Sequence, residues 1–232
     1  MLRRIAAASA VVLCAVPAVR AQDLDAVCRQ VMHPPVGAWS QLNMVGGRTN
    51  GATMRISIVG TETRRDTAYL WMEFAVRGVP MGVGGGDTIT IVNKMLVAGF
   101  GPGMSEPREH IMKFGGAPAM TMPVGAAGGA QGPSMMQDCI DGKVVGWESV
   151  TVPAGTFRAL HVQNAEGKGD SWVAPGLPFG LVKGATAGDA GDSGQMVLVG
   201  HGMGARSQIT EAPRPYDQQL LMQWMMGGGR HQ

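Results

Sequence analysis

Apolar and polar residues alternate along much of this chain, a pattern typical of strands with one buried face. Met54, Ile56 and Ile58 alternate with polar residues, and Leu70, Met72 and Phe74 share one face of the next apolar run. The same alternation predicts a first series of strands over 54–58, 68–76, 88–97 and 109–114. It predicts a second series over 143–152, 157–163, 170–174, 181–183, 195–200 and 205–210.

Two short stretches have helical signals instead. Residues 23–32 begin at a candidate N-cap, Asp23, and are followed by two prolines, whereas residues 216–226 end at three glycines. Between the strand series, residues 115–137 are rich in glycine and proline and are predicted to form a long loop. We therefore predict a mostly-β fold, a curved antiparallel sheet forming an open half-barrel with short N- and C-terminal helices.

Composition supports one β-rich domain over residues 22–232, with strand series in 38–114 and 143–210 joined by the 115–137 loop. The chain has 36 glycines in 232 residues, too many for a helical bundle. Residues 1–21 carry two early arginines, a short apolar core and small residues at the −3 and −1 positions before a cut after Ala21. These are the three regions of a secretory signal peptide, so we expect a periplasmic or secreted protein.

Removal of residues 1–21 takes three arginines from the chain and changes its formal net charge from +2 to −1. No basic cluster remains that could neutralise many phosphates, so we expect no nucleic-acid partner. After processing, no apolar stretch reaches the roughly 20 residues that a membrane-spanning helix needs. We therefore expect no transmembrane segment in the mature chain.

Two cysteines, Cys28 and Cys139, remain in the mature chain. An even number in an exported protein favours a disulfide, which would close a loop of about 110 residues. The alternative is a pair of buried free thiols.

Residues that could act in catalysis or bind a metal are far apart in the sequence. The five histidines lie far apart, without the spacing of a zinc site, and Ser193 lies in a Gly-Asp-Ser-Gly sequence without the histidine context of a serine protease. We therefore predict no catalytic residues, no metal ligands and no cofactor, and expect that the protein is not an enzyme. The 18 methionines leave one alternative open, because thioethers such as those of Met120 and Met122 are soft ligands for Cu(I).

The most informative segment lies between residues 145 and 183. It contains "VTVPAGTF", a strand and turn around Pro153 and Gly155, followed by "DSWVAP" and "PFGLVK". This segment resembles uncharacterised bacterial envelope proteins that are themselves similar to the outer-membrane lipoprotein carriers. In that superfamily an open, curved sheet wraps a hydrophobic cavity covered by helices, so the resemblance implies a half-barrel fold and a binding role.

If the sheet stays open, its apolar face could accept an acyl chain. The predicted ligand-binding residues are Met54, Ile56, Ile58, Leu70, Met72, Phe74 and Trp224. The expected function is therefore non-catalytic binding of a lipid or other apolar ligand in the cell envelope. Three alternatives to a lipid-binding protein remain open: a filled core on the same face, a methionine-based Cu(I) protein, and an envelope scaffold that binds another protein.

Overall fold

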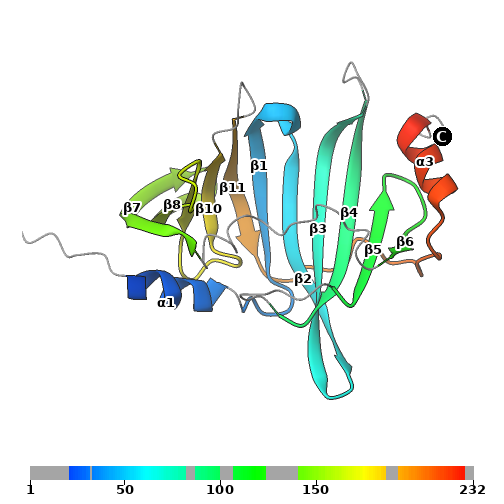
Figure 1. Cartoon of the computed structure of the whole chain (residues 1–232), viewed down its shortest axis with the longest axis horizontal. Coiled ribbons are helices and arrows are strands. Elements are labelled where there is room, and N and C mark those ends of the chain that lie inside the picture. The colour runs from blue at the N-terminus through cyan, green and yellow to red at the C-terminus, as the bar shows by residue number, and fades with distance from the viewer. Residues whose placement is uncertain are drawn as a thin grey trace, which may run out of the picture.

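The chain folds around one antiparallel sheet (Figure 1). The computed structural model describes residues 21–31, 33–81, 87–99, 107–123, 141–186 and 193–227. The strands of the first series are β1 (Trp39–Gly46), β2 (Thr53–Arg64), β3 (Thr67–Met81), β4 (Asp87–Val97), β5 (Glu109–Phe114) and β6 (Met120–Met122). Those of the second are β7 (Lys143–Val152), β8 (Gly155–Gln163), β9 (Gly169–Val173), β10 (Leu181–Thr186) and β11 (Gly194–Gly202). The other elements are α1 (Ala21–Val31), a single 3-10 turn (Gly47–Thr49) and α3 (Gln218–Gly227).

The two strand series meet at the centre of the sheet, in the order β6-β5-β4-β3-β2-β1-β11-β10-β9-β8-β7. Each series is a meander in which successive strands are neighbours. The first strand, β1, pairs along its length with the last, β11, with Leu42 opposite Leu198. Among the described residues the outer strands β6 and β7 do not pair with each other, so the sheet is open.

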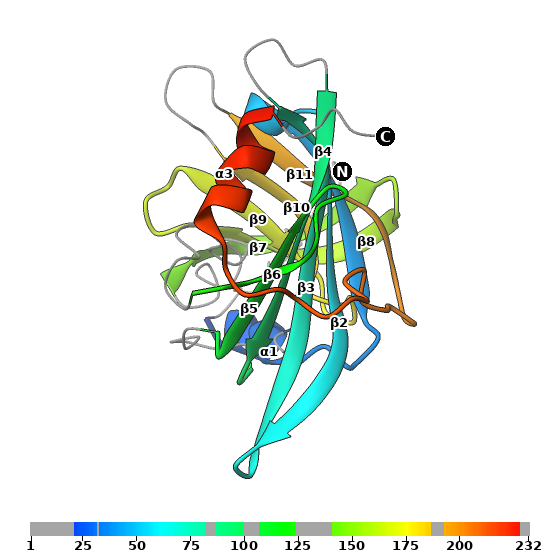
Figure 2. The same ribbon diagram turned by 90° about the vertical axis from the view of Figure 1, so that its right-hand side faces the viewer.

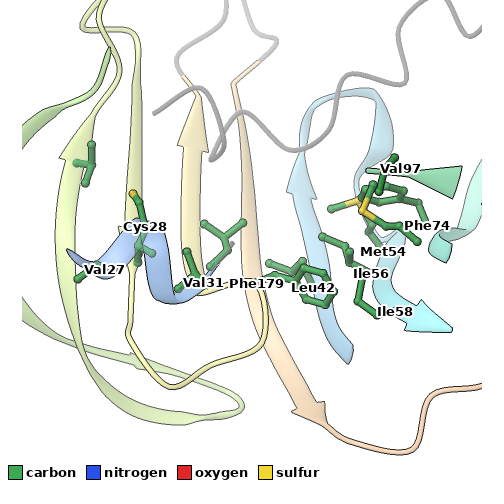
Figure 3. Close-up of a cluster of buried hydrophobic side chains, with 14 of the residues drawn as sticks. Val27, Cys28, Val31, Leu42, Met54, Ile56, Ile58, Phe74, Val97 and Phe179 are labelled. Atoms are coloured by element: carbon green, nitrogen blue, oxygen red, sulfur yellow. The ribbon is translucent and has the colours of Figure 1, made fainter. Parts of the chain in front are cut away.

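One face of the sheet, called the inner face below, carries the main hydrophobic cluster and is covered in part by α1. Leu24, Val27, Cys28 and Val31 follow one another at the spacing of a single helical face, and all four pack into this cluster. The sheet contributes Leu42 from β1, the alternating apolar residues of β2 and β3, and further residues from β4 and β8–β10. Figure 3 shows α1 and Phe179 on one side of the cluster and Ile56, Ile58 and Phe74 on the other.

The opposite, outer face is crossed by the segment 203–217, which connects β11 to α3 beside β5 and β6 (Figure 2). Glu73 of β3 is fully buried beneath this segment. Its carboxylate accepts hydrogen bonds from the Ser207 hydroxyl at 2.7 Å and from the Gln208 backbone N–H at 3.0 and 3.1 Å. Ile209 packs next to them in a second apolar cluster, against Ala75, Val92, Ile111 and Ala119.

The predicted strand at 205–210 is wrong. These residues form no strand: they lie across the outer face and do not join the sheet. Their alternation has a different cause, because Ser207 binds Glu73 and Ile209 enters the outer apolar cluster. A segment that lies on a sheet can thus show the same period as a strand within it.

The predicted fold class is confirmed: the protein is mostly β, with one open antiparallel sheet and a short helix near each end. Strands β2 and β3 run beyond the predicted 54–58 and 68–76, and two further strands were not predicted. Strand β1 begins at Trp39, ahead of the first predicted strand, and β6 lies inside the predicted 115–137 loop. Residues 1–20 and 124–140 lie outside the described residues, which leaves the signal peptide and the rest of that loop as predictions. No helix in the described part of the chain is long and apolar enough to cross a membrane.

Candidate functional site

A hollow opens on the inner face where β1, β9, β10 and β11 lie side by side. Its volume is about 210 Å³. Met44 and Met196, which lie directly opposite each other on β1 and β11, line it together with Ser171 of β9. Both methionines also pack against the main hydrophobic cluster, so the hollow is continuous with the apolar interior of the sheet. The remaining lining residues are Gly46, Thr49, Asn164, Gly169, Asp170, Gly184, Ala185, Thr186, Gly194 and Gln195.

Glycine at position 184 leaves room for this hollow in the middle of a strand. Gly184 lies opposite both Ser171 and Met196 in the sheet, where most residues would project a side chain from the inner face. A Cβ placed there would meet the methyl carbon of Met196 at 3.5 Å, an ordinary contact. The backbone therefore tolerates a side chain at this position, and its absence keeps the space open.

The polar side chains at the mouth of the hollow are held by local hydrogen bonds. Asn164 Oδ1 accepts the backbone N–H of Lys168 at 2.9 Å, and the Thr186 hydroxyl donates to the Gly194 carbonyl at 3.4 Å. A lining that combines apolar and polar side chains is suited to an amphipathic ligand.

The sequence-predicted ligand-binding residues occupy the main hydrophobic cluster next to this hollow. Met54, Ile56, Ile58, Met72 and Phe74 are buried, and the structure brings them together on the inner face of β2 and β3. Leu70 is partly buried and packs against them. The side chain of Trp224 lies outside the described residues. The hollow itself is lined by other residues, so binding by the predicted set stays a prediction.

A ladder of polar and aromatic side chains crosses the outer face of β7–β10. His161 Nδ1 lies 2.9 Å from Glu148 Oε1, and its Nε2 lies 2.8 Å from Asp170 Oδ1. The Trp172 ring stacks on the His161 ring with centroids 4.4 Å apart, and its N–H donates to Glu148 at 2.8 Å. The Lys183 ammonium lies 4.9 Å from the centroid of the Trp172 ring.

The contacts within this ladder favour a structural role for His161. Both of its ring nitrogens are occupied by carboxylates, which leaves neither nitrogen available to a substrate. The Trp172 hydrogen bond, followed by that of His161, lowers the pKa of Glu148. The carboxylate is therefore held ionised within a network that fastens β7, β8 and β9 to one another.

Sequence patterns did not indicate the hollow, because glycines and single polar residues on four strands carry no periodic signal. The only usable sign was the density of glycines near the ends of the second strand series. Cys28 of α1 is buried in the main cluster and disulfide-bonded. Cys139 lies outside the described residues, so the predicted Cys28–Cys139 pairing stays a prediction.

Comparison with known proteins gives no assignment. No family model matches the chain, and no curated protein matches its sequence. Among solved structures, a candidate lipoprotein from Parabacteroides distasonis ATCC 8503 is 13% identical over 75% of this chain and 99% of its own, with a TM-score of 0.36. A candidate exported protein with a YmcC-like fold from Bacteroides fragilis NCTC 9343 is 11% identical over 74% of this chain and 98% of its own, also with a TM-score of 0.36. At these identities and TM-scores, neither structure carries an argument about what this chain does.

Proposed function

We propose that this chain is an exported, non-catalytic binding protein of the bacterial cell envelope that holds an acyl chain or a similar apolar group. The observation that supports this most is the hollow on the inner face, where Met44 and Met196 line an opening in the apolar surface. Methionine side chains are flexible and adapt to irregular apolar ligands. The signal-peptide pattern of residues 1–21 supports export.

The volume of the hollow limits what it can hold. Pockets that enclose a drug-sized ligand measure about 300–1,000 Å³, whereas this one measures about 210 Å³. It would therefore accept the end of a single chain rather than a whole diacyl lipid. The ligand's polar group would remain at the mouth, beside Asn164 and Thr186.

Replacing Gly184 with leucine tests this proposal. The new side chain would project into the hollow beside Met196 and exclude the end of the acyl chain. We expect the affinity for a fluorescent fatty acid to fall at least about tenfold, because burial of two CH₂ groups alone contributes about 1.6 kcal/mol. The matched control is Gly116→Leu, at an exposed position where an added Cβ meets nothing within 4 Å. Equal affinity in Gly184→Leu and wild type would reject the hollow as the site. A wild-type protein that binds no fatty acid would reject the function.

We also propose that the disulfide of Cys28 is made with Cys139. Cys14 is the only other cysteine, and it leaves with the signal peptide. We expect Cys139→Ser to leave one free thiol, which reacts with Ellman's reagent once the protein is denatured, because Cys28 is buried. We also expect it to destabilise the mature protein by about 4 kcal/mol, because the bridge closes a long loop. Peptide mapping of the wild-type protein without reductant would detect the linked pair directly. A mature wild-type chain with two thiols that react after denaturation without reductant would contradict the pairing.

A further inference from the structure

A row of four buried side chains crosses the inner face from β3 to β6. Met72 lies opposite Met95, Met95 opposite His110, and His110 opposite Met122. His110 and Met72 are fully buried, and Met95 and Met122 are 3% and 7% exposed. In the sheet order, β2 separates the strands of this row from those that line the hollow described above.

Sheet geometry places these side chains within reach of one another. Directly opposed residues of neighbouring antiparallel strands share a face, with Cβ atoms about 4.5–5.5 Å apart. His110 on β5 therefore has a methionine beside it on each neighbouring strand, Met95 on β4 and Met122 on β6. Met112 and Met120, two residues along β5 and β6, lie opposite each other on the same face.

Only one of the two ring nitrogens of His110 has a hydrogen-bond partner. Its Nε2 lies 3.0 Å from the Asn93 side-chain oxygen, whereas its Nδ1 is buried and has no hydrogen-bond partner. An unpaired buried polar atom destabilises the folded state. With Nε2–H donating to the amide oxygen of Asn93, Nδ1 carries a free lone pair among thioethers.

We propose that His110 Nδ1 and the thioether sulfurs of Met95 and Met122 form a binding site for a soft monovalent metal ion, Cu(I) or its analogue Ag(I). Thioether and neutral imidazole are the donors that such ions prefer, and neither must lose a proton to bind. Harder ions are disfavoured, because the described residues contain no group of three His, Cys, Asp or Glu side chains that could hold a metal. The buried nitrogen would gain the partner that it lacks in the apo fold.

Titration of the mature protein with Ag(I) tests this site without a reductant that could open the disulfide. Native mass spectrometry gives the number of ions bound, and ¹⁵N spectra of histidine side chains show which nitrogen binds. We expect the Nδ1 resonance of His110 to move strongly upfield as one ion binds, while its Nε2 resonance changes little. No Ag(I) binding, or an unchanged His110 Nδ1 resonance at saturation, would overturn the proposal.

Paired substitutions separate this site from the other methionines. Leucine replaces methionine with nearly equal volume, so Met95→Leu with Met122→Leu should leave the fold intact. We expect this pair to weaken Ag(I) binding at His110 at least about tenfold, because two soft ligands are removed. The matched control is Met44→Leu with Met196→Leu, another directly opposed pair on the inner face. Equal weakening in both pairs, or none in the first, would overturn the proposal.

Discussion

Replacing Gly180 with alanine should lower the free energy of unfolding by about 3 kcal/mol, because it combines a strained backbone with an overpacked contact. Gly180 has φ of +68°, a conformation that disfavours any side chain. A Cβ there would lie 2.5 Å from a methyl carbon of Val31 in α1 and 2.8 Å from one of Val173. The added methyl group would therefore push α1 away from the inner face.

Gly176 provides the control for this prediction, since it lies four residues earlier in the same turn region with φ of +82°. A Cβ at Gly176 meets nothing within 4 Å. Gly176→Ala should therefore cost about 1 kcal/mol from backbone strain alone. Urea unfolding followed by tryptophan fluorescence measures both variants. Equal decreases in stability would show that the contact with α1 contributes nothing.

Removal of the Glu73 carboxylate should have a similarly large effect. Glu73→Ala leaves the Ser207 hydroxyl and the Gln208 N–H without their buried acceptor, and we expect a decrease in stability of about 3 kcal/mol from hydrogen bonds to a charged group. The segment 203–217 should then loosen from the outer face. Hydrogen exchange at the Gln208 amide would report that release, alongside the unfolding free energy.

Two further variants test whether Glu73 stabilises the protein by holding the segment 203–217 on the outer face. Ser207→Ala removes one of the donors, so its effect should overlap with that of Glu73→Ala in a double-mutant cycle instead of adding to it. Glu166→Ala, at an exposed glutamate, should change the stability by less than about 0.5 kcal/mol. An unchanged rate of hydrogen exchange at the Gln208 amide in Glu73→Ala would show that Glu73 does not hold this segment on the sheet.

The sequence predicted strands where one face of the strand is apolar and the other is more polar. In β2 and β3 one face enters the main cluster and the other is more polar, so alternation located the strands. The same signal failed at 205–210, because a segment that lies on the outer face without joining the sheet also alternates. Strand β6 is only three residues long and lies between glycine- and proline-rich stretches, which hid it.

The candidate sites were less predictable because they depend on register. Met95, His110 and Met122 come from three strands and meet only through the pairing of those strands. No spacing along the chain relates them, so the positions of the five histidines in the sequence indicate no site. The hollow at Gly184 has the same origin, since its lining joins four strands and depends partly on a missing side chain.

The pairing of β1 with β11 has a consequence for how this protein is made. The centre of the sheet joins Leu42 to Leu198, so neither meander acquires its central neighbour until nearly the whole chain has been synthesised. Pairings that distant in sequence slow folding, often to milliseconds or seconds. A nascent chain would therefore stay incompletely folded for longer than one built from local pairings, and a translocon that threads unfolded polypeptide would have that interval in which to engage it.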